Sequence, residues 1–426
     1  MSLNRILSIP VFVALAFSLA SEAFAQRYHI GDIQLFRPAQ ITDYGDEPHS
    51  NYGFYFGVDW IGYHLSNPRR GLVGANITRQ VFNFGIGDGT TGGGGGLANA
   101  TSDLDTAGFD ARFHNGERID FGYVGTDGTG WGMSTFNLHG RTTNVYGSNV
   151  SVLFNDPQNL NNGFLDLTGP AGVPDGFDDD LNSNGVYGRN GVDTDVPPDG
   201  EPDSPFPTDN GDRVTFPMNF PSVVLRLTTR TYSTDVQRTW RTKGGQFGGW
   251  IDWGVGGRFS VFKDRFSFEG FGGVLADTVI VQSATNNIVA PQFSLRWFNI
   301  CYRWTYSADL RIAPGINFQT IQQRSSIGSN IVPGAANNPL GLSPAGASNT
   351  LHIAEFSPII DLRFGVGYKV TDYITARIGA NTVYMDGIAR SPDMINYTLP
   401  NAGILGGNNR QPVFLYGLNV GIEINR

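Results

Sequence analysis

Several features are scarce in this chain, and each scarcity excludes a class of protein. Cys301 is the sole cysteine among 426 residues, so no internal disulfide framework can hold the chain together, and we expect a plain strand residue there. Charged residues make up 16% of the chain, against about 25% in ordinary soluble domains. Beyond residue 25 no stretch approaches about 18 consecutive apolar residues, which excludes a transmembrane helix. The chain also lacks the basic stripe that a nucleic-acid partner requires.

Histidine is equally sparse, and its positions do not favour an enzyme. No pair of histidines has the spacing of metal ligands, and no Gly-x-Ser-x-Gly nucleophile elbow occurs. We therefore expect no catalytic residues. The alternative is a barrel hydrolase that assembles its triad from separate strands. The six histidines are His29, His49, His64, His114, His139 and His352.

The first residues predict export from the cytoplasm. Arg5 precedes an apolar run from Ile6 to Leu19, which Pro10 interrupts. Ala23-Phe24-Ala25 then has the small-x-small form of a signal-peptidase site. We predict a signal peptide over 1–25 and a polar N-terminal lead over 26–50.

Abundant glycine and aromatic residues point to β-structure. The chain holds 57 glycines, and aromatic residues make up 12%. Residues 414–424 show the recurring pattern: alternate positions are large and apolar, and the positions between them are mostly small or polar. Side chains of a strand alternate between two faces, so this stretch predicts a strand with one apolar and one polar face. The same alternation recurs over 52–63, 118–124, 222–231, 250–261, 298–306, 362–369 and 374–384.

These strands predict an all-β fold, a single transmembrane antiparallel β-barrel of roughly 12 strands, with an even strand number, over residues 51–426. We expect tight turns at His114-Asn115-Gly116, Gly125-Thr126-Asp127-Gly128 and Val370-Thr371-Asp372. Minor candidate strands lie at 78–86 and 107–113. A soluble β-sandwich is the alternative, but one of its edge strands should break the pattern. Long extracellular loops are expected at 87–105, 155–213, 323–349 and 387–411.

Charged side chains recur on the polar faces of the predicted strands. A ring of charges lining a pore tunes its ion selectivity, so we predict a pore-lining role for them. Alternatively, they pair across strands and close the lumen as a polar core. The predicted pore-lining residues are Asp252, Arg258, Glu269, Arg303, Arg311, Arg363, Arg377 and Glu423.

The chain's formal charge of −9 is concentrated in one segment. Residues 156–212 hold twelve Asp, Glu201 and a single Arg189, so the strand-rich remainder is close to neutral. Asp180-x-Asn182-x-Asn184-Gly185 matches positions of an EF-hand-like calcium loop, but Gly191 stands where a bidentate Glu belongs. Ca²⁺ is thus a candidate ligand, and a solvated acidic loop is the alternative. The predicted ligands are Asp178, Asp180, Asn182, Asn184, Asp193 and Asp195.

The C-terminal third shows a family resemblance. Gly367-Tyr368-Lys369-Val370-Thr371, Gly387-Ile388-Ala389-Arg390-Ser391-Pro392 and Gly417-Leu418-Asn419-Val420-Gly421 resemble an outer-membrane β-barrel porin family of planctomycete-type, Gram-negative bacteria. In that family the Arg and Pro of the second motif adjoin, whereas Ser391 separates them here. The resemblance implies a porin-like barrel with no catalytic residues.

The predicted function is passive diffusion of small hydrophilic solutes across the outer membrane. The alternative is a non-conducting surface barrel, or a secreted β-protein, whose Asp-rich loop binds calcium or a surface partner. The expected partners are the lipid bilayer of the outer membrane and the barrel-assembly machinery, with a homo-oligomer left open.

Overall fold

The computed structural model describes ten stretches of the chain, and the account below concerns them alone. They are residues 52–74, 79–82, 97–100, 102–109, 113–156, 214–243, 249–273, 275–331, 344–398 and 401–425. The predicted signal peptide, the N-terminal lead and nearly all of the acidic segment lie outside the described residues.

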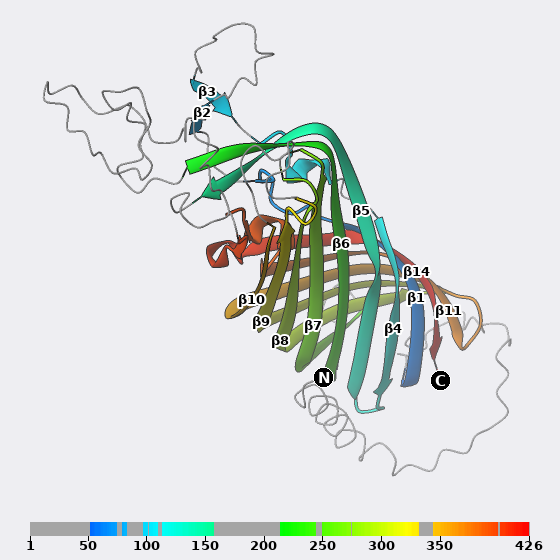
Figure 1. Ribbon diagram of the computed structural model, residues 1–426. Helices are drawn as coiled ribbons and strands as arrows, with labels where there is room; N and C mark the ends of the chain where they lie inside the picture. Colours follow the sequence, from blue (N-terminus) through cyan, green and yellow to red (C-terminus); the bar gives the residue numbers. More distant parts are fainter. Residues whose placement is uncertain are drawn as a thin grey trace, which may run out of the picture.

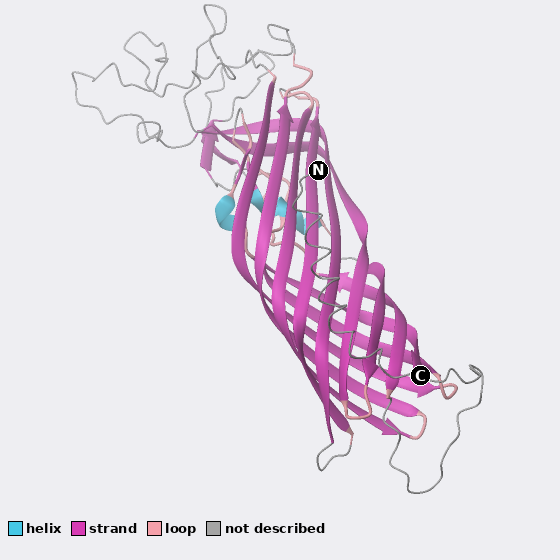
Figure 2. Cartoon of the chain, turned by 90° about the horizontal axis from the view of Figure 1, so that it is seen from below, coloured by secondary structure: helices cyan, strands magenta, loops and turns pink. Residues whose placement is uncertain are grey.

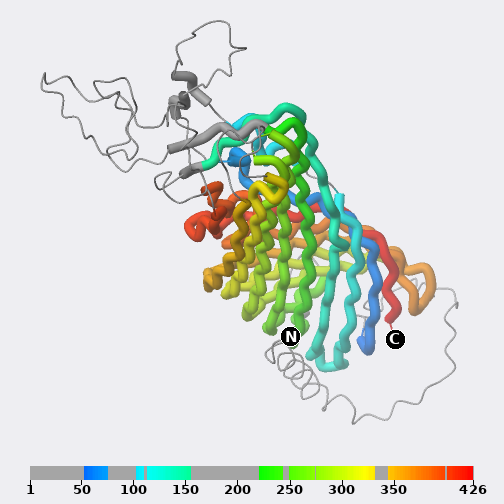
Figure 3. The backbone as a smooth tube through the Cα atoms, viewed as in Figure 1, coloured from blue at the N-terminus to red at the C-terminus, as the bar shows by residue number. Residues whose placement is uncertain are grey.

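Ten antiparallel strands form one closed barrel (Figure 1). Neighbouring strands are consecutive in the sequence, apart from short elements within two of the connections, and β1 pairs with both β14 and β4 to close the ring. Figure 3 shows this closure, where the blue β1 lies beside the red β14. The strands are β1 (Gly53–Leu65), β4 (Phe113–Val124), β5 (Thr129–Asp156), β6 (Val214–Lys243), β7 (Trp250–Phe271), β8 (Thr278–Cys301), β9 (Trp304–Ile327), β10 (Ala345–Lys369), β11 (Ile374–Ile388) and β14 (Gln411–Asn425).

Short turns and longer connections lie at opposite ends of the barrel. The turns at 125–128, 302–303 and 370–373 share one end with the start of β1 and the finish of β14. We call this the turn end and the opposite one the loop end. Two predicted turns, Gly125–Gly128 and Val370–Asp372, are confirmed.

The prediction of roughly 12 strands is wrong, although the even number is right. The candidate strand 78–86 contributes β2 (Arg79–Phe82), which pairs with β3 (Leu97–Ala100) outside the barrel. Of the candidate 107–113, Thr106–Gly108 forms a short 3-10 helix. The four residues of β2 are fewer than the about 9–11 that spanning a bilayer needs.

The predicted turn at His114-Asn115-Gly116 is also wrong, because all three residues lie within β4. Gly116 permits close strand contact instead of a turn. A Cβ atom at this position would stand 2.1 Å from the backbone oxygen of Asn137 on β5. Glycine is thus required at position 116, but because of the neighbouring strand and not because of a turn.

The outer face of the barrel is apolar next to the turn end. Exposed side chains there include Trp60, Trp253, Trp304, Phe364 and Leu418, which are 44–57% accessible. Large aromatic residues outside a barrel are typical of the belt that sits at a membrane interface. No helix in the described part of the chain is both long and apolar enough to cross a membrane.

Several strands are far longer than a membrane requires. β5 to β10 have between 22 and 30 residues, whereas about 9–11 residues span a bilayer. The barrel wall therefore continues past the apolar band at the loop end, where Figure 1 shows β5 and β6 arching over the lumen. For the same reason the predicted loop 323–349 is too long at both ends, because β9 continues to Ile327 and β10 begins at Ala345.

The connection between β11 and β14 folds into the barrel, so the predicted extracellular loop 387–411 is wrong in placement. It contains two short helices, η4 (Ser391–Met394) and η5 (Gly406–Asn408), and two short strands, β12 (Ile395–Asn396) and β13 (Gly403–Ile404). Figure 2 shows short helices, in cyan, against the strands at the loop end. Ser391, Met394 and Ala402 have no exposed surface. We call residues 389–409 the plug segment.

Candidate functional site

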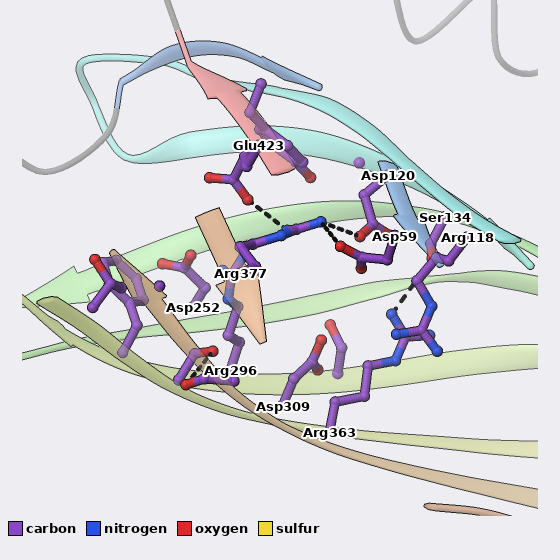
Figure 4. Close-up of a pocket in the computed structure, with 18 of the residues that line it drawn as sticks. Asp59, Arg118, Asp120, Ser134, Asp252, Arg296, Asp309, Arg363, Arg377 and Glu423 are labelled. Carbon is purple, nitrogen blue, oxygen red and sulfur yellow. Dashed lines mark hydrogen bonds and ion pairs between the residues drawn. The ribbon is translucent and has the colours of Figure 1, made fainter. Parts of the chain in front are cut away.

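A charged cavity lies inside the barrel at the turn end. Its volume is about 170 Å³, and six arginines and six carboxylates line it together with hydroxyl and amide side chains. We call it the vestibule (Figure 4). Period-two alternation builds it, because every inward position of a strand faces this space. The charged lining residues are Arg118, Arg241, Arg296, Arg311, Arg363, Arg377, Asp59, Asp120, Asp235, Asp252, Asp309 and Glu423.

Arg377 on β11 connects three carboxylates from three other strands. Its guanidinium lies 2.6 Å from Glu423 Oε2, 3.0 Å from Asp59 Oδ1 and 3.4 Å from Asp120 Oδ2. Figure 4 shows these contacts converging on one side of the vestibule. β11, β14, β1 and β4 are consecutive in the ring, so this cluster ties the two ends of the chain together.

Buried ion pairs form the floor of the vestibule. Asp361 Oδ2 accepts from Arg258 Nη2 and from Arg363 Nη2, both at 2.7 Å. Arg311 donates to Asp235 Oδ1 at 2.8 Å and to Asp309 Oδ2 at 2.9 Å. Buried charges persist when an opposite charge and hydrogen bonds offset the cost of desolvation, and each of these side chains has a carboxylate or guanidinium partner.

Six of the eight predicted pore-lining residues do face the interior. Asp252, Arg311, Arg363, Arg377 and Glu423 line the vestibule, and Arg258 lies buried in its floor. Two do not, because Glu269 alternates with the buried Phe268 and Gly270, and Arg303 lies in the turn between β8 and β9. Successive residues of a strand face opposite sides, so a side chain one position away from an inward residue lies outside the lumen. A side chain in a two-residue turn also lies outside it.

Sequence reasoning left out several vestibule residues that carry the same signal. Asp59 and Asp120 stand at polar positions of strands that were correctly predicted. Asp235 was missed because the predicted strand stopped at Thr231, whereas β6 continues to Lys243. Arg118 was missed as well. Its guanidinium donates to Tyr63 Oη at 2.6 Å inside the barrel.

Apolar side chains cross the lumen beyond the vestibule. They belong to β1, β5, β7, β8, β9, β10, β11 and β14, pack as one cluster, and are 0–6% exposed. We call this cluster the apolar layer. Its members come from eight of the ten strands, and it lies between the vestibule and the loop end. Its members are Ile61, Tyr63, Leu65, Phe136, Leu138, Phe262, Ile288, Ala290, Ala313, Ile359, Val383, Met385, Ile388, Val413 and Leu415.

The plug segment lies on the loop side of this layer and is hydrogen-bonded to the barrel wall. Asn286 on β8 donates to Ala389 O at 3.0 Å and accepts from Ala389 N at 2.8 Å. Gln319 on β9 donates to Asn409 O at 3.1 Å, and Asn349 on β10 donates to Ala402 O at 3.0 Å. Polar side chains of the barrel wall thus form hydrogen bonds with backbone groups of the plug segment that are buried away from water.

A buried ion pair holds the start of the plug segment. Arg390 Nε lies 2.7 Å from Asp264 Oδ2 on β7, with side-chain exposures of 1% and 0%. Ser391 Oγ donates to the backbone oxygen of Asp264 at 2.6 Å. The motif that carries the family resemblance therefore has a structural role here, and Ser391 shares it with Arg390.

Asp393 is the one carboxylate of the plug segment. Its Oδ2 accepts from Gln411 Nε2 at 2.8 Å, and Arg69 Nη1 lies 3.8 Å away. Partial burial raises the pKa of the Asp393 carboxyl above its ordinary value, although Arg69 and Gln411 oppose the shift.

The predicted calcium ligands Asp178, Asp180, Asn182, Asn184, Asp193 and Asp195 lie outside the described residues, so calcium binding stays a prediction. Across the stretches that the structure does describe, no group of three or more His, Cys, Asp or Glu is arranged to hold a metal ion.

Comparison with known proteins returns likenesses of shape alone. No protein-family model matches the chain, and no curated protein does. Among solved structures, the outer membrane protease OmpT from Escherichia coli matches at 8% identity and a TM-score of 0.36, covering 88% of this chain and 97% of its own. The Ralstonia pickettii toluene transporter TbuX matches at 11% identity and a TM-score of 0.16, covering 92% of both chains. A Pseudomonas aeruginosa FadL homologue matches at 7% identity and a TM-score of 0.21, covering 88% and 90%. Likenesses this loose assign no function.

Proposed function

We propose that this chain is an outer-membrane barrel that is closed to solute diffusion at rest and that holds its loop end at the cell surface as a binding scaffold. The apolar layer carries this proposal. A lumen crossed by a packed cluster that is 0–6% exposed leaves no continuous water path through the described barrel. The surface barrel thus replaces passive diffusion as the favoured function.

The physical argument against diffusion rests on desolvation. A hydrated ion or sugar would have to shed its water within the apolar layer, where the lining is mostly hydrocarbon and replaces little of the lost hydration. The plug segment adds a second closure in series, fixed by Arg390 and Asp264 at 2.7 Å. The vestibule is therefore a blind chamber that opens at the turn end.

The charge balance of the vestibule supports the same proposal. Selective channels present an excess of one sign along the path of the ion. Here six arginines face six carboxylates, and most of them are tied in ion pairs within the protein. These side chains act as a polar core that braces the barrel wall.

Membrane placement is supported by the outer face. The apolar band with exposed Trp60, Trp253 and Trp304 would be unfavourable in water, and a closed barrel leaves no unpaired strand edge within lipid. Refolded chain should float with lipid vesicles in a density gradient and resist extraction by high salt. Recovery in the soluble fraction would restore the secreted β-protein as the better interpretation.

Single-channel recording tests the closed state. The refolded full chain, shown by flotation to have inserted, should give no discrete conductance steps in a planar bilayer, with or without calcium. Reproducible steps of one size would overturn the proposal and return passive diffusion to first place. An open porin reconstituted by the same protocol is the control for the method.

A further inference from the structure

Four basic side chains gather on the outer face of β6 and β7, beyond the apolar band. They are Arg226 and Arg230 on β6 and Lys263 and Arg265 on β7, and all four are exposed. We call them the basic patch. Figure 1 shows these two long strands side by side.

The strand register fixes the direction in which the basic patch points. Thr229 and Asp264 are paired across the two strands, are both buried, and share a hydrogen bond of 2.6 Å inside the barrel. Their sequence neighbours Arg230 and Lys263 are also directly opposite one another and therefore lie on the outer face. Arg265 and Arg226 follow on the same face, opposite Thr228 and Ser267.

The basic patch begins where the apolar band ends. Tyr232, two residues after Arg230 on the same face and nearer the turn end, is 37% exposed and lies opposite Val261. From there towards the turn end the outer face carries Trp253 and Val255. Towards the loop end, the next outward positions are Arg230, Thr228 and Arg226 on β6 and Lys263, Arg265 and Ser267 on β7, all of them polar. If the band marks the hydrocarbon, these cations stand at the depth of the lipid headgroups in the leaflet at the loop end.

Nothing in the described part of the protein neutralises these four charges. None of them forms an ion pair with another described residue. Glu269, the one acidic side chain on the outer face of this stretch of β6 and β7, accepts from Ser267, and Asp264 points inward and pairs with Arg390. Like charges directly opposite each other on a sheet destabilise it. An external anion would remove that cost, and arginine's planar fork matches the oxygens of a phosphate group.

We propose that the basic patch binds the phosphate groups of an anionic lipid in the leaflet at the loop end. The inference rests on the proposed membrane placement and adds a specific lipid contact to it. Headgroup attraction amounts to about fivefold in affinity per basic residue near the surface. Loss of two residues should therefore weaken binding by about 30-fold.

Native mass spectrometry of the refolded full chain in neutral detergent tests this. Diphosphoryl lipid A is the probe, its dephosphorylated form is the lipid control, and inorganic phosphate is the free-anion control. Wild type should retain the phosphorylated lipid, and R230Q/K263Q should retain it about 30-fold more weakly. R226Q/R265Q repeats the test should the first variant fail to fold.

Arg238→Gln is the matched control, because Arg238 lies on the outer face of the same strand near the turn end, 5.7 Å from the Trp240 ring. It should leave lipid retention within about twofold of wild type, since Arg238 lies outside the patch. Equal retention of the dephosphorylated lipid, equal binding of inorganic phosphate, or unchanged retention by both double variants would each overturn the inference. A chain that fails to float with vesicles would instead refute the membrane placement.

Discussion

Arg390 and Arg258 are each 1% exposed, the lowest values among the arginines in the described part of the chain. Each survives burial because a carboxylate lies 2.7 Å away, Asp264 for Arg390 and Asp361 for Arg258. Arg258 connects two strands of the barrel wall, β7 and β10, whereas Arg390 attaches a connecting segment to that wall. The same chemistry thus serves two purposes, and the difference lies in which part of the chain supplies the arginine.

Removing Asp264 should be costly. Asp264→Asn leaves the Arg390 guanidinium buried without a counter-charge, and we expect the free energy of unfolding to fall by about 3–5 kcal/mol. The double variant D264L/R390M should lose less than the single one, because no charge remains buried. Urea unfolding of the refolded protein, followed by tryptophan fluorescence, measures both.

The control for that series is Arg410→Gln. Arg410 pairs with Glu355 but is 68% exposed, so its loss should cost below about 1 kcal/mol. A loss for Asp264→Asn no larger than this would show that the buried pair does not hold the plug segment.

At the scale of elements, we expect the packing of the plug segment to depend on pH through Asp393. Asp393 holds its proton more tightly in the folded protein, because burial raises its pKa above the ordinary value of 3.8. The stabilising effect of protonation is complete below pH 3.8 and is lost as the pH rises through the raised folded pKa. Acidification should therefore tighten the plug segment.

Amide hydrogen exchange over residues 389–409, corrected for the intrinsic rate at each pH, measures this. Protection should be higher at pH 4 than at pH 7 in the wild type. In Asp393→Asn it should be the same at both values, since the amide cannot ionise. Greater protection at pH 7 in the wild type would mean that Arg69, 3.8 Å away, dominates over burial.

At the level of the whole molecule, the barrel is closed twice along its axis. The apolar layer and the plug segment touch, since the Arg390 guanidinium lies 5.3 Å from the centre of the Phe262 ring. The two closures are formed by different residues, so we expect that opening one leaves the other closed. This arrangement distinguishes the barrel from a pore narrowed by a single inward loop.

Replacing residues 391–408 with a short Gly-Ser linker should therefore leave the barrel non-conducting. Adding F262S and I288S should produce conductance steps, because the apolar layer then admits water. Planar-bilayer recording of the three proteins decides between one closure and two. Steps in the linker variant alone would show that the apolar layer does not seal the lumen.

Period-two alternation made the barrel predictable from the chain alone. It identified most strands and the apolar outer face, and six of the eight charges that it placed in the interior lie there, because a strand's two faces follow from its covalent geometry. It failed where glycine had a second cause, as at Gly116, and where a polar connection turned inward, as in the plug segment.

Alternation states which face a side chain occupies, but not what lies across the lumen from it. Arg118 and Asn381 are 263 positions apart and meet at 3.4 Å, and Arg390 and Asp264 meet across 126 positions. Such contacts depend on ring closure, strand number and stagger, which no local pattern encodes. The sequence thus determined a barrel with a charged interior, and the tertiary packing determined that this interior is closed.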